Sequence, residues 1–101
     1  MIGSINGLGV KGISYGAQAK EVPESTRNGS NRADAIIRAV VDGKPGNVLL
    51  LEMQAGAYDT GQYGPAEEDP AVFEATKVAA VANKSVVVAA AGNGNVNLDD
   101  P

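Results

Sequence analysis

Apolar residues recur at helical spacing in the segment that follows Asn31. Residues at i, i+3, i+4, i+7 and i+8 share one stripe of a helix. In this segment the stripe consists of Ala33, Ile36, Ile37, Val40 and Val41. Ser30 or Asn31 can cap the start of such a helix, whereas Gly43 and Pro45 end it. The pattern therefore predicts a helix over residues 31–42.

A second helix is predicted over residues 69–83. Asp69 is suited to the N-cap, and Pro70 is suited to the first helical position because its missing N–H would have no partner within the helix. The expected inner face consists of Val72, Ala75, Thr76 and Ala79. Asn83 and Lys84 are expected to end the helix.

Two short runs, residues 48–53 and 86–91, are almost continuously apolar. Such runs are typical of strands that are covered on both faces. Helices that alternate with such strands indicate parallel strands joined by crossover helices, and therefore an α/β fold. Residues 17–23 predict a weaker third strand, because Lys20 and Glu21 interrupt it. The sequence thus predicts two main helices and two to three parallel strands.

The composition excludes several kinds of chemistry. The 101 residues include neither cysteine nor histidine, so this chain cannot itself provide a disulfide, a thiolate nucleophile, a zinc–thiolate site or an imidazole base. Eight basic and twelve acidic residues give a net charge of -4, which argues against binding nucleic acid. No apolar run approaches the roughly 18–20 residues of a transmembrane helix.

Both ends of the sequence are expected to be cuts within a longer domain. Residues 1–10 are rich in glycine and lack the basic start and long apolar stretch of a secretory signal. Residues 95–101 stop in polar turn residues, with no closing element of secondary structure. These features predict an internal piece of a larger protein.

The glycines near the N-terminus match a ligand-binding pattern. Gly7, Gly9 and Gly12 fit G-x-G-x-x-G, which binds dinucleotides when a strand precedes the glycines and a helix follows them. Little strand pattern precedes these glycines, and Gly16 interrupts the segment that follows. We therefore expect a loop without a nucleotide.

An acidic cluster precedes the second predicted helix. Glu67, Glu68 and Asp69 offer three carboxylates that could hold a hard cation such as calcium. Capping by Asp69 and a favourable interaction of the glutamates with the helix dipole account for the same residues. Because these two roles already explain all three side chains, we expect capping.

The most informative segment is the end of the second apolar run. Three valines at 86–88 are followed by three alanines at 89–91 and then by Gly92, Asn93 and Gly94. Side chains that shrink toward the carboxyl end of a strand leave space for a ligand, at the end where open α/β sheets bind ligands. Asn93 would place an amide donor at the edge of this space. A small-residue strand followed by an ordinary Asn-Gly turn accounts equally well for the same sequence.

At this segment the sequence resembles the subtilisin-like serine proteases (subtilases). Their catalytic domain carries a very similar Val-Val-Val-Ala-Ala-Ala-Gly-Asn run after a helix like residues 69–83. Residues 6–14 are similar to the loop that follows the helix of the catalytic histidine. Residues 48–56 are similar to the strand that leads to the substrate-binding segment. The likeness in order and spacing extends over residues 6–97.

The resemblance implies roles for particular residues. Asn93 would be the catalytic residue of this chain, because its side-chain amide would donate to the substrate carbonyl oxygen in the oxyanion hole. The pocket for the side chain preceding the cleaved bond would be lined by Ala90, Ala91 and Gly92. An extended peptide would pair, as an added strand, with Glu52, Met53, Gln54, Ala55 and Gly56. The family usually has Ser-Leu-Gly where this chain has Glu-Met-Gln at 52–54.

The resemblance also implies what the chain lacks. Residues 1–101 would be an internal segment of one catalytic domain with a three-layer parallel sheet, between the catalytic histidine and the catalytic serine. The aspartate, histidine and serine of the triad would lie outside it, so the chain alone is expected to be inactive. We expect no cofactor or metal in this segment, although the family allows calcium elsewhere in the domain. Its partner would be a peptide or protein substrate, and the family suggests secretion or a cell-surface location.

One implication concerns the sheet. In this family the strand of the catalytic aspartate lies between the counterparts of residues 48–53 and 86–91. Without that strand, the two apolar strands would face an open slot with unpaired backbone groups. We therefore expect the chain to rearrange, to exchange an element or to self-associate.

Two other hypotheses remain open. The chain would instead be a complete small α/β binding or interaction module if it shared only the Ala-Gly-Asn turn with the proteases. Such a module is expected to be a cooperative monomer. A dinucleotide-binding half-domain, the third hypothesis, would be stabilised by nucleotide.

Overall fold

The computed structural model describes residues 3–56, 62–95 and 97–99. In chain order its elements are β1 (Ser25–Thr26), β2 (Gly29–Ser30), α1 (Arg32–Asp42), β3 (Val48–Leu51), β4 (Gln54–Gly56), β5 (Tyr63–Pro65), η1 (Ala66–Glu68), α2 (Pro70–Lys77), η2 (Val78–Ala82) and β6 (Val86–Ala89). The strands form three pairs: β1 with β2 and β4 with β5 are antiparallel, whereas β3 with β6 is parallel.

Helix α1 begins and ends where the sequence predicts. The Asn31 side chain accepts a hydrogen bond from the Asp34 N–H at 2.9 Å, and the Gly43 N–H donates to the Ala39 carbonyl at 2.9 Å. The buried stripe is narrower than predicted, because Ile36 is buried whereas Val41 is 80% exposed. The helix therefore turns only part of its apolar surface toward the core.

Helix α2 also confirms its prediction. The Asp69 side chain accepts from the Ala71 N–H at 2.9 Å, and the helical path continues through η2 to Asn83. Val72, Ala75 and Ala79 are buried on its inner face. Asp69 is thus a helix cap, and no group of three potential metal ligands occurs in the described part of the chain.

Strands β3 and β6 form the parallel pair that the apolar runs predict. Val48 lies opposite Val86, and Leu51 lies opposite Ala89. Hydrogen bonds just outside the strands extend the pairing, from the Val86 N–H to the Asn47 carbonyl at 2.9 Å and from the Ala90 N–H to the Leu51 carbonyl at 3.1 Å. The two strands pair directly, so the slot that the resemblance implies between them is closed in this structure.

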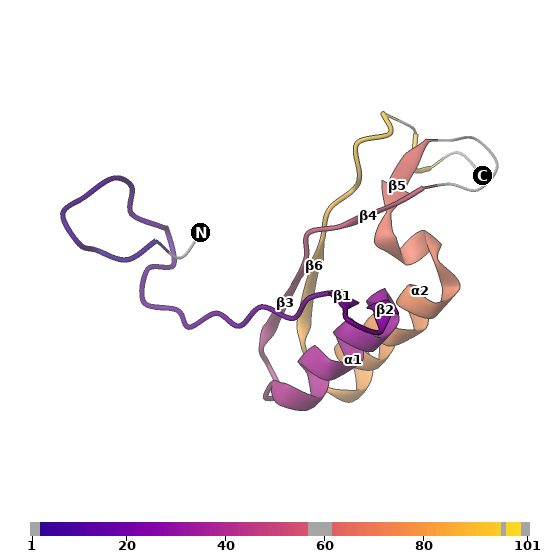
Figure 1. Cartoon of the computed structure of the whole chain (residues 1–101), viewed down its shortest axis with the longest axis horizontal. Helices are drawn as coiled ribbons and strands as arrows, with labels where there is room; N and C mark the ends of the chain where they lie inside the picture. The colour runs from indigo at the N-terminus through magenta and orange to yellow at the C-terminus, as the bar shows by residue number, and fades with distance from the viewer. Residues whose placement is uncertain (1–2, 57–61, 96, 100–101) are drawn as a thin grey trace.

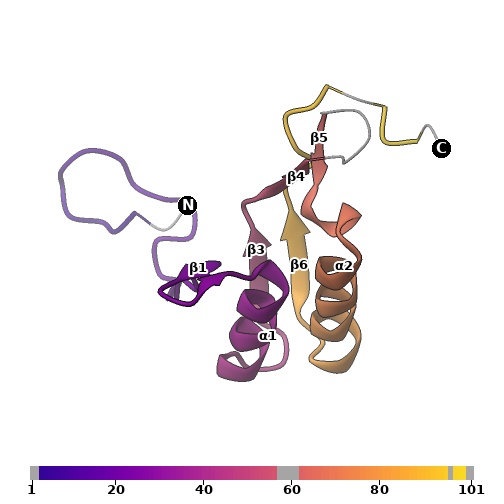
Figure 2. The same ribbon diagram turned by 45° about the vertical axis from the view of Figure 1, so that its right-hand side comes forward.

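The helices α1 and α2 cover the same face of this sheet (Figures 1 and 2). Between helices and sheet lies a core that consists of Ile36, Leu51, Ala66, Val72, Ala75 and Ala79. The other face is open, with exposed fractions between 44% and 69% for Val48, Leu50, Val86 and Val88. The prediction that both faces are covered was wrong for the described residues, which form two layers rather than three. Successive side chains of a strand point to opposite faces of the sheet. Since both helices lie on one face, only every second residue of each apolar run packs against a helix.

Residues 3–24 contain neither a helix nor a strand, so the strand predicted over residues 17–23 is wrong. The N-terminal part of this segment extends away from the helices and the sheet (Figure 1), and it carries exposed apolar side chains at Ile5, Leu8, Val10 and Ile13. Because the described residues before Gly7 form no strand and residues 13–24 form no helix, the dinucleotide pattern lacks its required context. Among the described residues, no helix has both the length and the apolar character needed to cross a membrane.

Candidate functional site

A hollow of about 340 Å³ lies beyond the carboxyl ends of β3 and β6. Its lining consists of Glu52, Met53, Gln54, Ala90, Ala91, Gly92 and Asn93. The parallel register explains this meeting, since Leu51 lies beside Ala89 and the chain leaves both strands at the same edge of the sheet. Ligands bind at this edge in open α/β sheets. Residues 52–54 and 90–93, which are far apart in the sequence, are thus brought together.

Ala55 and Gly56, which were also predicted to bind substrate, do not line the hollow. Ala55 is buried, and β4 pairs with β5 so that Ala55 lies opposite Gly64 and Gly56 opposite Tyr63. One edge of the segment expected to hold a peptide therefore already holds a strand of this chain. Sequence reasoning treated residues 55–68 as a loop because of their glycines and Pro65, and so it missed both strands.

Asn93 lies at the rim of the hollow with its backbone fixed and its side chain uncommitted. The Asn93 backbone N–H donates to Gln54 Oε1 at 3.1 Å. No described residue forms a hydrogen bond with the Asn93 carboxamide, and the residue is exposed. The carboxamide can therefore donate to an oxygen atom of a ligand in the hollow.

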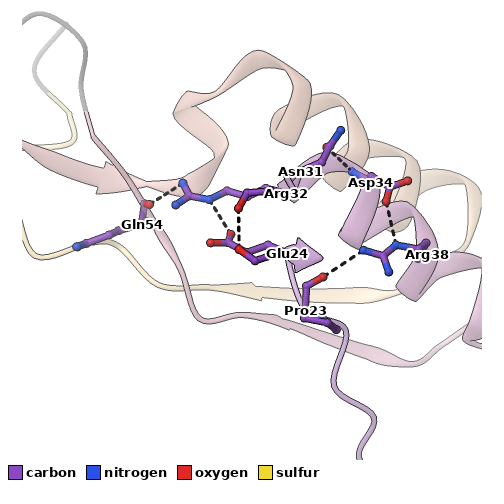
Figure 3. A network of polar contacts seen from close by, with 9 residues as sticks. Pro23, Glu24, Asn31, Arg32, Asp34, Arg38 and Gln54 are labelled. Atoms are coloured by element: carbon purple, nitrogen blue, oxygen red, sulfur yellow. Dashed lines mark hydrogen bonds and ion pairs between the residues drawn. The ribbon is translucent and has the colours of Figure 1, made fainter. Parts of the chain in front are cut away.

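Gln54 is in turn held by a network that reaches helix α1 (Figure 3). Arg32 Nη1 donates to the Gln54 carbonyl at 2.8 Å, and Arg32 Nε pairs with Glu24 Oε2 at 2.8 Å. The Asn31 N–H completes the connection by donating to the Glu24 carbonyl at 2.8 Å. Charge-assisted hydrogen bonds are shorter and stronger than neutral ones, although the side chains of Arg32 and Glu24 are about one third exposed, which weakens their ion pair.

The sequence analysis did not single out Arg32 as part of the site. Arg32 is separated from Gln54 by 22 positions, and Gln54 from Asn93 by 39. Periodicity and short sequence motifs do not predict contacts between residues that are so far apart in the sequence. One sequence feature does point to a specific partner for Arg32. It lies in the first turn of a helix, where the helix dipole disfavours a positive charge.

The turn that carries Asn93 packs backbone against backbone on β5. Gly92 has a φ of +88°, and a Cβ added there would lie 2.7 Å from the Gly64 carbonyl oxygen. A Cβ at Gly94 would collide with the Tyr63 carbonyl oxygen. Only glycine allows so close an approach, so the turn is held both by its packing on β5 and by the hydrogen bond from the Asn93 N–H to Gln54.

This packing predicts a large effect of Gly92→Ala on stability. Gly46 is a matched control, because its φ of +86° is almost the same but no atom lies within 4 Å of an added Cβ. Gly46→Ala is expected to cost about 1–2 kcal/mol for the left-handed backbone alone. Gly92→Ala is expected to cost roughly 1–3 kcal/mol more, as overpacking does. Urea unfolding followed by circular dichroism measures both, and equal losses would contradict the packing of this turn on β5.

The hollow carries one ionisable side chain. Glu52 is exposed directly after β3, and every other lining residue is neutral. No described residue forms a hydrogen bond or an ion pair with its carboxylate. The basic side chains of Arg32, Arg38 and Lys20 pair with other carboxylates. The charge of Glu52 is therefore not neutralised within the site.

No protein family model, no curated protein and no solved structure matches this chain. The hollow and the side chains around it are therefore the basis for a functional proposal.

Proposed function

We propose that this chain is part of the catalytic domain of a subtilisin-like serine endopeptidase, in which it supplies the oxyanion-hole amide and one wall of the peptide groove. One observation carries the proposal. Residues 52–54 and 90–93, which the resemblance assigns to substrate and oxyanion binding, surround the same hollow. An asparagine with an uncommitted carboxamide lies at its rim.

In the complete domain, a serine would attack the peptide carbonyl while a histidine took its proton and an aspartate oriented the histidine. Asn93 would donate its side-chain amide to the carbonyl oxygen as negative charge develops there. Gln54 would keep Asn93 in place through the Asn93 N–H. Ala90, Ala91 and Gly92 would leave room for the substrate side chain. The chain alone would bind peptide without cleaving it.

The direct pairing of β3 with β6 sets a condition on this proposal. By the resemblance, the strand of the catalytic aspartate lies between these two strands. The ladder that joins Val48–Leu51 to Val86–Ala89 would therefore have to open to admit it. Opening the ladder gives up several backbone hydrogen bonds, each with a net contribution of about 0.5–1.5 kcal/mol, which the inserted strand would have to replace with its own.

The same direct pairing favours a second candidate function, a small α/β binding module without catalysis. In that case the sheet is complete as two strands, and the hollow holds a ligand that is not cleaved. A module of this kind is expected to unfold cooperatively as a monomer, and adding further domain segments would not change its stability.

A graft distinguishes the two candidates. Residues 6–97 would replace the matching segment of a subtilase catalytic domain that provides its own aspartate, histidine and serine. We expect the graft to hydrolyse a fluorogenic peptide and the isolated chain not to. A graft that folds, as judged by circular dichroism, but has no activity would exclude the protease function. Turnover by the isolated chain that disappears in Asn93→Ala would show that the triad is not needed and would also contradict it.

A further inference from the structure

We propose that Glu52 makes this site selective for peptides that carry lysine or arginine, an inference that rests on the proposed peptide groove. The carboxylate of Glu52 is the single charge among the residues that line the hollow. It lies directly after β3, at the edge of the sheet where the hollow is.

The surroundings of Glu52 do not cancel this charge. Three of the described basic side chains are engaged elsewhere, Arg32 with Glu24, Arg38 with Asp34 and Lys20 with Asp42. Lys84 lies at the opposite end of the sheet, where its carbonyl accepts from the Gly46 N–H next to the start of β3. A cationic group that enters the hollow would therefore find an unpaired carboxylate.

The rest of the lining fits the stem of a basic side chain. Lysine and arginine bury an aliphatic stem along apolar surface while the charged end stays in water. Ala90 and Ala91 leave space for such a stem, Met53 offers an apolar surface to it, and Glu52 is exposed to solvent. The hollow of about 340 Å³ is open to solvent, so the charged end of the side chain can stay in water.

The effect is expected to be moderate because the carboxylate is exposed. Water screens the attraction between opposite charges at an exposed site, so the attraction is much weaker there than in a buried site. Ordering of the side chains offsets part of this attraction. We expect a lysine peptide to bind roughly three- to tenfold more tightly than its neutral analogue, less so at high salt.

Nuclear magnetic resonance of the full ¹⁵N-labelled chain tests this inference. The probes are acetylated and amidated tetrapeptides that differ in one residue, which is lysine, norleucine or glutamate. The reporters are the backbone signals of Gly92 and Asn93 and the side-chain amide of Asn93. We expect the lysine peptide to bind most tightly and the glutamate peptide least. Glu52→Gln is expected to remove this order, whereas Glu74→Gln, at an exposed position of α2 that does not line the hollow, is expected to preserve it.

The outcomes separate this inference from the proposed function. Equal binding of the lysine and norleucine peptides would overturn the role of Glu52 but leave the peptide groove intact. A lysine preference that survives in Glu52→Gln would also overturn it, because the charge would then lie elsewhere. If no peptide moves the reporters, the groove and its selectivity both fail.

Discussion

Asn93→Ala in the grafted protease is expected to lower kcat by about 10²–10³ with little change in KM. This range, about 2.7–4 kcal/mol of transition-state stabilisation, was established by removing one oxyanion-hole donor from a subtilisin. The physical reason is that the amide interacts most strongly with the oxygen that gains charge as the bond is attacked. It contributes much less to binding the neutral carbonyl of the substrate, so kcat carries the loss.

Asn47→Ala is the control for this change. Asn47 is an exposed asparagine directly before β3, at the end of the sheet opposite the hollow. Its replacement is expected to leave kcat nearly unchanged, because Asn47 does not line the hollow, and to change the free energy of unfolding by no more than about 0.5 kcal/mol. If Asn93→Ala lowers kcat no more than Asn47→Ala, Asn93 does not stabilise the oxyanion.

Sequence reasoning succeeded where the determining interactions are local. The caps at Asn31 and Asp69 depend on N–H groups two or three positions away, and the apolar runs of β3 and β6 depend on residues within one strand. The taper from valine to alanine to Gly92 is local as well. The taper indicates space for a ligand at the end of this strand, and residues 90–93 line the hollow.

Interactions between distant segments account for what the sequence did not predict. The periodicity of α1 includes both Ile36 and Val41, but only the packing of α1 against α2 and β3 decides that Ile36 is buried and Val41 is not. The contact of Arg32 with the Gln54 carbonyl likewise needs β4 to pass the start of α1. Neither outcome follows from spacing along the chain.

Leu51→Ala and Leu50→Ala are expected to differ greatly in stability although they are neighbours on β3. Leu51 is 2% exposed and belongs to the core cluster with Ile36 and Val72, whereas Leu50 is 44% exposed on the open face. Leu51→Ala is expected to cost about 2–5 kcal/mol, because it removes buried methyl groups and leaves a cavity. For a domain with about 5–15 kcal/mol of total stability, that loss is a large fraction of the free energy of unfolding.

Leu50→Ala is expected to cost less than about 1 kcal/mol, because much of the side chain is already in water and its loss leaves no closed cavity. Urea unfolding of both variants, with light scattering to measure mass, tests the pair. A Leu50→Ala loss as large as that of Leu51→Ala would mean that the open face is covered in solution. A midpoint that rises with protein concentration would then identify a second copy as the cover, as the proposed self-association requires. A midpoint independent of concentration would instead point to the chain's own N-terminal segment, whose Ile5, Leu8, Val10 and Ile13 are exposed in the structure.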